Sequence, residues 1–407
     1  MFPSLIHRFL LRQHFWRHAT FSEVGELYAA RLLRMTANSL VSVFVAVFLY
    51  KNGYSLAYIA SFYALYFAFK AIFISVPAAL LTAKIGPKHG MLIANLCAIP
   101  SLIALPLLPY FDVWALVIFT VFQGTSITLY GICHLVDFSK VKHDKNAGKE
   151  ISFMNIMDKI AAGISPLIGG MIAWLAAPEV TMWLAAGLFL VAAVPLMRTA
   201  EPVKLGQKLT FVGFPWRETW RSLVANVGVG FDNTTTIIVW PLFLTIVVFA
   251  ASGSSVYAQI GGLATVTLFV GFLASRMYGV LIDRRRGGEL LRYATIANSF
   301  THAIRPFIIT PISAALTNVI NETATTGYYM AFIRGMFDLA DRSGHRIAYL
   351  LLIEVTLNIG SLFASLIFLG FVLVLQEQAA LSATFFAAAI LTLLIATARF
   401  PLYRRRT

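Results

Sequence analysis

Charged residues are scarce in this 407-residue chain: they make up 12% of it, whereas hydrophobic residues make up 59%. A soluble domain carries about 25% charged residues. So few polar side chains cannot cover the surface of a water-soluble protein of this length. Apolar runs of roughly 20 residues recur along the chain, and each is long enough to cross a bilayer core of about 30 Å. The composition therefore predicts an all-α polytopic membrane protein.

The chain also lacks the residue patterns of catalytic and metal sites. Its two cysteines, Cys97 and Cys133, both lie inside apolar runs, which argues against a disulfide framework or a thiolate metal site. No Gly-x-x-x-x-Gly-Lys phosphate loop and no His-Glu-x-x-His motif occurs. The polar segments are too short to hold a catalytic domain. We therefore expect no enzymatic activity, no cofactor and no metal.

Acidic residues are fewer than basic ones, and the formal net charge is +14. The basic residues do not form the single patch of a nucleic-acid-binding protein but lie in short clusters between apolar runs, which is typical of cytoplasmic loops. This bias predicts a cell-membrane protein with both termini in the cytoplasm and anionic lipid headgroups near its loops; Lys51 and Arg305 remain on the opposite side. The predicted cytoplasmic residues are Arg8, Arg12, Arg17, Lys84, Lys88, Lys140, Lys142, Lys145, Lys149, Arg284, Arg285, Arg286, Arg342, Arg346, Arg404, Arg405 and Arg406, with the segment 198–221.

The apolar runs predict about twelve transmembrane helices. Their spans are 26–50, 54–82, 91–109, 113–136, 150–175, 179–197, 221–249, 255–281, 290–309, 312–336, 347–376 and 380–400. The predicted organisation is an amphipathic surface segment (1–25), a six-helix bundle (26–197), a cytoplasmic linker (198–220), a second six-helix bundle (221–400) and a basic tail (401–407). We expect a monomer.

The two predicted bundles repeat one another at an offset of about 200 residues. The segment "NGYSLAYIASFYAL" (52–65) aligns with "SGSSVYAQIGGLAT" (252–265), and "LLTAKIGPKHGMLI" (80–93) aligns with "YGVLIDRRRGGELL" (278–291). Six helices followed by six more in the same orientation form a parallel repeat about an axis normal to the membrane.

This pattern resembles the major facilitator superfamily of secondary transporters. The family's motif between its second and third helices is Gly-x-Leu-x-Asp-Arg-x-Gly-Arg-Arg, and Gly279, Leu281, Asp283 and Arg284 match it, with Gly287 one place late. The resemblance implies that this loop latches helix ends within one bundle: the aspartate accepts from helix-end amides and the arginines bind carboxylates. The alternative is a solvated basic loop with no latch role.

The first-half copy of this loop departs from the motif. It keeps Lys84, Gly86 and Lys88 but has Ala83 in place of the aspartate, so we expect a weaker latch there.

Two further motifs are partial. Residues 120–126 resemble the fourth-helix Arg-x-x-Gln-Gly motif with Thr120 in place of arginine, and 163–170 resembles the fifth-helix antiporter motif with Ser165 in place of the first glycine. The missing fourth-helix arginine (Thr120) and the missing aspartate of the first loop (Ala83) weaken an inference to proton-coupled drug antiport. Close helix packing through small residues is the favoured explanation of 163–170.

Polar residues inside the predicted helices mark a candidate site. An ionisable group at mid-bilayer costs at least about 2.5–3.5 kcal/mol, so each needs a reason. The resemblance implies that the first, fourth, seventh and tenth helices line a central cavity. The polar residues that these helices carry are Asn38, Gln123, Asp232, Asn233, Asn321 and Glu322.

Glu322 is the expected coupling residue, whereas functional and structural roles are equally weighted for Asp232. The structural alternative for both is a carboxylate neutralised by protonation or by a cation. Lys70 is the first counter-ion candidate, with Arg34 or Arg305 as alternatives.

The repeat also places Asp158 opposite Glu354, each about two turns into its helix. We expect them to act as a gate between the bundles; the alternative is a carboxylate near a positive helix end. For His134 and His302, which have no partner at a suitable spacing, we expect structural roles.

These features predict a secondary transporter that works by alternating access. With 33 Phe, 15 Tyr and 7 Trp in the chain, we expect a small organic or amphipathic solute, driven by an ion gradient, for which protons are a candidate, or by the solute's own gradient. The partial fifth-helix motif favours export. The alternative is a transporter-like membrane sensor or scaffold that binds without transporting.

Overall fold

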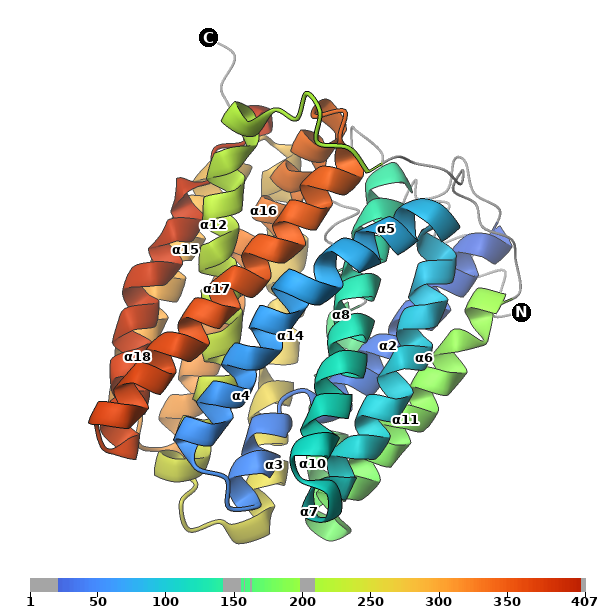
Figure 1. Ribbon diagram of the computed structural model, residues 1–407. Helices are drawn as coiled ribbons and strands as arrows, with labels where there is room; N and C mark the ends of the chain where they lie inside the picture. Colours follow the sequence, from blue (N-terminus) through green and yellow to red (C-terminus); the bar gives the residue numbers. More distant parts are fainter. Residues whose placement is uncertain (1–20, 142–154, 157, 162, 198–208, 404–407) are drawn as a thin grey trace, which may run out of the picture.

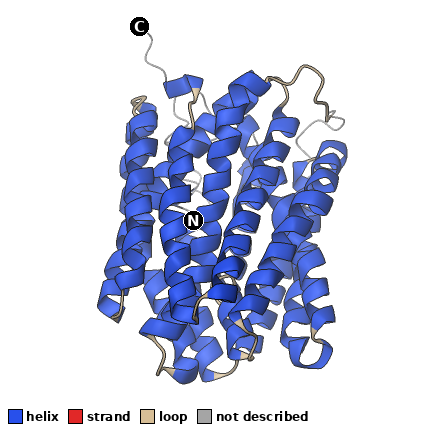
Figure 2. Ribbon diagram, turned by 60° about the vertical axis from the view of Figure 1, so that its left-hand side comes forward, coloured by secondary structure: helices blue, strands red, loops and turns tan. Residues whose placement is uncertain are grey.

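A computed structural model describes residues 21–141, 155–156, 158–161, 163–197 and 209–403. Every regular element in these residues is helical, and most helices run side by side along one direction (Figures 1 and 2). An all-helical structure suits a lipid environment, because each helix satisfies its own backbone hydrogen bonds.

The first half of the molecule contains the helices that precede residue 198. Their bounds are α2 Phe21–Val41, α3 Val45–Lys51, α4 Leu56–Phe69, η1 Lys70–Ile74, α5 Ser75–Ile85, α6 Pro87–Ala104, η2 Leu105–Leu107, α7 Leu108–Phe111, α8 Val113–Val141, α10 Ser165–Leu175, α11 Pro178–Ala193 and η3 Pro195–Met197. The first predicted helix is interrupted, since α2 ends at Val41 and α3 begins at Val45. Proline at the first turn of α6 and α11 fits the positions where no backbone donor is required.

The second half begins with α12. Its helices are α12 Trp216–Thr234, η4 Thr235–Val239, α13 Trp240–Phe243, η5 Leu244–Val248, η6 Gly253–Ser255, α14 Val256–Asp283, α15 Gly287–Ile304, η7 Arg305–Phe307, α16 Pro311–Arg342, α17 Arg346–Val374, α18 Glu377–Leu391, η8 Thr392–Thr397 and η9 Pro401–Tyr403. Helix α12 starts before the predicted residue 221 because its first turn is polar and escapes a search for apolar runs. Thr310 caps α16 in a reciprocal pair with Ser313.

Nine segments of the described residues are long and apolar enough to cross a membrane. They are Ala29–Lys51, Leu56–Ile85, Pro87–Phe111, Val113–Val136, Pro178–Met197, Trp216–Val248, Gly253–Asp283, Arg346–Val374 and Glu377–Thr397. Helices α10, α15 and α16 occupy the three other predicted positions, and α16 is long but carries several polar residues. The described helices are thus consistent with the predicted twelve.

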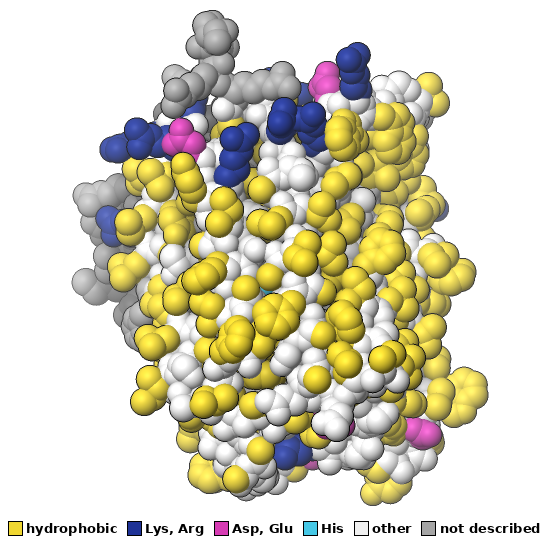
Figure 3. Space-filling view, turned by 90° about the vertical axis from the view of Figure 1, so that its left-hand side faces the viewer, with side chains coloured by type: hydrophobic (Ala, Val, Ile, Leu, Met, Phe, Trp, Pro, Cys, Tyr) yellow, Lys and Arg dark blue, Asp and Glu magenta, His cyan; other side chains and the backbone are white. Residues whose placement is uncertain are grey.

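The surface divides into an apolar flank and a basic end. Hydrophobic side chains cover the flank, and most of the visible lysines and arginines gather at one end of the molecule (Figure 3). We call this the basic end; exposed cationic residues at it are Lys84, Arg217, Arg284, Arg285, Arg286 and Arg342. Its counterpart, with the turns around Asn52 and Asp112, is the opposite end. The distribution is typical of a membrane protein with one cationic face.

The two halves meet along two pairs of helices. Helix α4 of the first half packs along α17 of the second, and α10 packs along α14 (Figure 1). The α10–α14 contact is close because Gly170 lies against the backbone of Tyr257 and Gly261 lies against that of Pro166. Small residues allow such an approach of two helix backbones.

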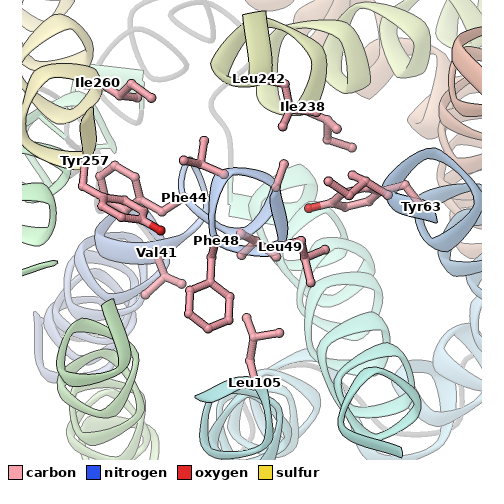
Figure 4. Packing of buried hydrophobic residues seen from close by; sticks show 14 of the residues in the cluster. Val41, Phe44, Phe48, Leu49, Tyr63, Leu105, Ile238, Leu242, Tyr257 and Ile260 are labelled. Atoms are coloured by element: carbon pink, nitrogen blue, oxygen red, sulfur yellow. The ribbon is translucent and has the colours of Figure 1, made fainter. Parts of the chain in front are cut away.

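Apolar residues of both halves seal the opposite end. In Figure 4, Phe44 and Leu49 of the first half and Leu242 and Tyr257 of the second converge in one buried cluster. The rings of Phe44 and Tyr257 meet edge to face at 5.7 Å between centroids. A second cluster near the basic end also contains residues of both halves, such as Ala83 and Leu350.

Candidate functional site

An ion pair joins the two halves near the middle of the bundle. Lys159 of the first half binds the Glu322 carboxylate on α16 of the second half. Glu322 lies about 16 Å along α16 from Pro311, a depth close to the centre of a 30 Å hydrocarbon core. Its other partner is the Thr326 hydroxyl, which donates to Oε1 at 3.1 Å. The side chains of Lys159 and Glu322 are 27% and 17% exposed, so the described residues do not fully enclose this pair.

A second ion pair between the halves is almost fully buried. Lys70 Nζ lies 3.8 Å from Glu354 Oε1, and the two side chains are 5% and 8% exposed. The same oxygen accepts from the Thr128 hydroxyl at 3.2 Å and from Asn358 Nδ2 at 3.1 Å. Glu354 is therefore held by groups of both halves.

The local structure of α4 and α5 presents Lys70 to this contact. Lys70 begins the π-helical turn η1, which interrupts the α-helix of this span. The carbonyl of Lys70 accepts from the Ser75 hydroxyl at 2.8 Å. Such turns are often found at functional sites, because they reorient side chains without ending the helix. Lys70 therefore neutralises Glu354 rather than Glu322 or Asp232.

Asp158 forms its ion pair within the first half. Arg31 Nε and Nη2 donate to its two carboxylate oxygens at 2.7 and 2.5 Å, a bidentate geometry that is strong and directional. Of the two carboxylates expected to gate the halves, Glu354 thus bridges them and Asp158 does not. One polar contact beside Asp158 does cross the interface: Asn155 Nδ2 donates to Ser275 Oγ at 2.7 Å.

Asp232 is enclosed within the second half and is 1% exposed. Its Oδ1 lies 2.6 Å from His302 Nε2 and accepts from Asn298 Nδ2 at 2.9 Å, and its Oδ2 accepts from the Tyr328 hydroxyl. These groups come from α15 and α16. Three donors around one carboxylate stabilise its charged form.

The ring of His302 links Asp232 to Arg305. Arg305 Nη1 lies 3.0 Å from His302 Nδ1, and a guanidinium can only donate. Nδ1 must therefore accept, which leaves the proton on Nε2 to bind Asp232. Arg305 also lies over the ring of Trp240, at 4.9 Å from its centroid. Arg305 thus serves as a counter-charge to Asp232 through a neutral histidine.

Arg34 is the first-half counterpart of Asp232, with the opposite charge. Arg34 Nη1 donates to Asn95 Oδ1 at 2.8 Å, and Nη2 donates to the carbonyl and hydroxyl oxygens of Ser126 at 3.1 Å. The guanidinium also lies over Tyr130, at 4.0 Å from the ring centroid. Among the described residues, the groups that bind Arg34 are neutral.

The predicted amides lie at several depths of burial. Asn38 and Asn233 are partly exposed, whereas Gln123 and Asn321 are buried. Gln123 accepts from the Ser101 hydroxyl at 2.8 Å, which ties two helices of the first half together. Among the described residues, Asn321 Oδ1 has no hydrogen-bond partner.

Thr120 lies outside this polar region. It lines an apolar groove of about 460 Å³ between α4 and α8, together with residues such as Phe62, Phe69 and Val117. An arginine in this groove would place its charge among apolar side chains, which is costly. The departure from the fourth-helix motif is therefore compatible with its surroundings here.

The motif loop of the second half joins α14 to α15 at the basic end. Asp283 is the last residue of α14, and Arg285 adopts a left-handed conformation with φ of 61°. Gly287 lies so close to the Tyr403 ring that an added Cβ would overlap it. The Tyr403 hydroxyl donates to the Ala331 carbonyl at 2.8 Å. The loop thus holds the segment Pro401–Tyr403 against α16.

The corresponding loop of the first half is shorter. Gly86 adopts a φ of 88° between α5 and α6, a conformation that favours glycine. Lys88 is 2% exposed, whereas Lys84 points to solvent. Ala83 belongs to the apolar cluster near the basic end, so an aspartate in its place would be buried.

The predicted motif at 163–170 is a close-packing element. An added Cβ on Gly169 would lie 2.4 Å from the Leu40 carbonyl oxygen, and one on Gly170 would lie 2.2 Å from that of Tyr257. The Ser165 hydroxyl, at the start of α10, donates to the Ala161 carbonyl at 2.6 Å. These contacts agree with packing through small residues.

Comparison with known proteins identifies the class to which this architecture belongs. Residues 27–338 match the family model described as "Major Facilitator Superfamily". The human organic anion transporter MFSD10 has a similar structure, with a TM-score of 0.68 at 10% identity, covering 92% of this chain and 98% of that one. The structure of the nucleoside transporter NupG is also similar, with a TM-score of 0.66 at 10% sequence identity. The Escherichia coli fucose:proton symporter FucP has a TM-score of 0.63 at 15% identity. Both comparisons cover 92% of this chain and 98% of the other chain. No curated protein matches.

The family model covers more than half of the chain and points to a secondary transporter rather than to an enzyme. The chain belongs to the Major Facilitator Superfamily. The resemblance expected from the motif loop and the repeat is thereby confirmed, and a small-molecule substrate follows from the family.

Sequence reasoning did not identify three residues of the site. The sequence did not indicate the ion pairs of Lys159 and Arg31. For His302 it predicted a structural role and did not indicate the contact with Asp232. The position of Lys159 beside Asp158 was an available signal, because both ionisable residues lie inside a predicted membrane helix. The spacing of His302 and Arg305 places them one helical turn apart, which was a second signal.

Proposed function

We propose that this protein is a secondary active transporter that moves a small organic or amphipathic solute across the cell membrane by alternating access. The observation that carries the proposal is the partly exposed Lys159–Glu322 ion pair, which joins the two halves at mid-bundle depth. A static scaffold gains little from charges inside a membrane, since each costs a few kcal/mol. A transporter uses them, because the halves exchange partners as they move.

Proton coupling through Glu322 follows from the location of its partner. When the halves separate on one side, Lys159 moves with the first half and Glu322 with the second. A carboxylate that loses its cation in a low-dielectric site takes up a proton more readily. Glu322 therefore binds a proton in one state and releases it in the other. Export is the proposed direction, from the partial motif at 163–170.

A two-stage experiment tests the proposed function. A thermal-shift screen of the purified protein against metabolites and drugs identifies ligands, since a ligand at a hundred times its Kd adds about 2.7 kcal/mol to stability. The best ligand is then radiolabelled and offered to proteoliposomes with and without a pH gradient. Accumulation that depends on the gradient supports proton-coupled transport, and gradient-independent flux supports transport without coupling. Saturable binding with no flux would favour the sensor or scaffold alternative.

The basic end is proposed to face the cytoplasm, with both termini on that side. Its exposed lysines and arginines support this orientation. Reporter fusions after residues 52, 112, 253 and 378 should all report the outer side, whereas fusions within the motif loop at Arg285 should report the cytoplasm. Two or more inverted signals would contradict the proposed topology.

A further inference from the structure

The two halves contribute charges of opposite sign to their interface. Lys70 and Lys159 come from the first half, and their partners Glu354 and Glu322 come from the second. The carboxylate next to Lys159, that of Asp158, is already bound through both oxygens by Arg31. When the halves separate, the described part of the first half therefore offers these two lysines no carboxylate in place of Glu354 and Glu322.

Arg34 increases this positive excess. It is 4% exposed and is bound by the amide of Asn95, the oxygens of Ser126 and the ring of Tyr130, all of which are neutral. The cationic side chains between the two ends of the described first half are Arg31, Arg34, Lys70 and Lys159, against the single carboxylate of Asp158. A low-dielectric wall with this charge balance attracts anions.

The two ion pairs differ in how readily a ligand can replace the carboxylate. Glu354 is buried and bound by Thr128 and Asn358 in addition to Lys70. Glu322 is more exposed, and its second partner is a hydroxyl of its own helix. The carboxylate beside Lys159 is therefore held by fewer groups, and is less enclosed, than the one beside Lys70.

We propose that the transported solute is an organic anion whose acid group replaces the Glu322 carboxylate beside Lys159 when the halves separate. This inference rests on the proposed transport function and names its substrate class. The ammonium of Lys159 needs a counter-charge inside the bundle, because an unpaired charge in a low-dielectric site is costly.

The face of α16 that carries Glu322 also offers a place for the organic part of the solute. Thr326 and Tyr329 follow Glu322 at spacings of four and seven residues, which lie on one helix face. Tyr329 is 39% exposed. Its ring and hydroxyl can contact an apolar body and a polar substituent, respectively.

Binding of small acids to the purified full-length protein tests the proposal. The probes are sodium acetate, benzoate and 2-naphthoate, their neutral amides, and benzylamine as a cation of similar size. Apparent Kd values come from the dependence of the unfolding temperature on probe concentration. We expect at least one carboxylate to stabilise the wild type, with the matching amide at least about tenfold weaker, a difference of 1.4 kcal/mol.

Substitutions at the pair give the decisive comparison. Lys159→Gln should weaken the carboxylate at least about tenfold, and Lys159→Arg should retain it. Glu322→Gln removes the internal competitor and should tighten the same carboxylate by about tenfold. Glu354→Gln, at the buried pair, is the matched control and should not tighten it. The double variant Lys159→Gln/Glu322→Gln carries no unpaired charge and should fold without binding the acid.

Several results would overturn the anion site. They are the absence of carboxylate binding to both wild type and Glu322→Gln, carboxylate binding that survives Lys159→Gln, and preferential binding of benzylamine that is lost in Glu322→Gln. The proposed function can fail separately: carboxylates that bind as expected but never cross the liposome membrane would retain the anion site and exclude transport. Flux of a neutral or cationic ligand without anion binding would support transport and exclude the anion site.

Discussion

Glu322→Gln should still fold, with lower stability because Lys159 loses its carboxylate partner, and should lose uphill accumulation of solute in proteoliposomes while downhill exchange continues. Glutamine keeps the shape of the side chain and its hydrogen bond with Thr326, but it cannot take up and release a proton. One proton moving down a unit pH step supplies about 1.4 kcal/mol, and this driving force is lost with the titratable group. The measurement is the steady-state ratio of labelled solute inside and outside liposomes that carry a pH gradient.

A matched substitution separates coupling from a general effect of lost charge. Glu218→Gln changes an exposed carboxylate on the first turn of α12 and should accumulate solute like the wild type. If Glu322→Gln also concentrates solute at the wild-type rate, then Glu322 has a structural role. Asp232, which is linked to Arg305 through His302, would then become the candidate for coupling.

The fold was predictable from the sequence because membrane helices leave a strong and local signal. Long apolar runs predict the positions of the helices, and the repeated loops at 80–93 and 278–291 predict two halves with the same helix order. The break between Val41 and Val45 and the π-helical turn at Lys70 were not predictable. Both are adjustments of backbone geometry to packing, and they do not change the hydropathy of the run in which they occur.

The candidate site was predictable only in part, for a different reason. The depth of Glu322 and Asp232 follows from their position in a helix, but the partner of each depends on the direction in which the helix faces. Glu322 and Lys159 are far apart in the sequence and meet only because α16 and the fifth helix lie at the interface of the halves. Asp232, in contrast, faces α15 and α16. A single sequence contains no direct measure of these rotations.

Gly261→Ala should shift the protein toward the state that is open at the opposite end and slow transport at least about tenfold, which corresponds to 1.4 kcal/mol. The added Cβ would lie 2.2 Å from the Pro166 carbonyl oxygen across the α10–α14 contact. A backbone oxygen cannot move aside as a flexible side chain can, so the two helices must separate. Spin labels at Ser55 and Ser252, which lie on different halves at this end, should report longer distances in the variant.

The neighbouring residue provides the control for this substitution. At Gly262 an added Cβ would meet only Leu167 Cδ1, at 4.0 Å, so Gly262→Ala should keep the wild-type distances and rate. Both substitutions exchange glycine for alanine within α14, where alanine favours the helix by up to about 1 kcal/mol. A difference between them therefore reports the contact between the halves and not the stability of the helix. Equal distance distributions and equal rates in the two variants would show that the α10–α14 contact does not limit the conformational change.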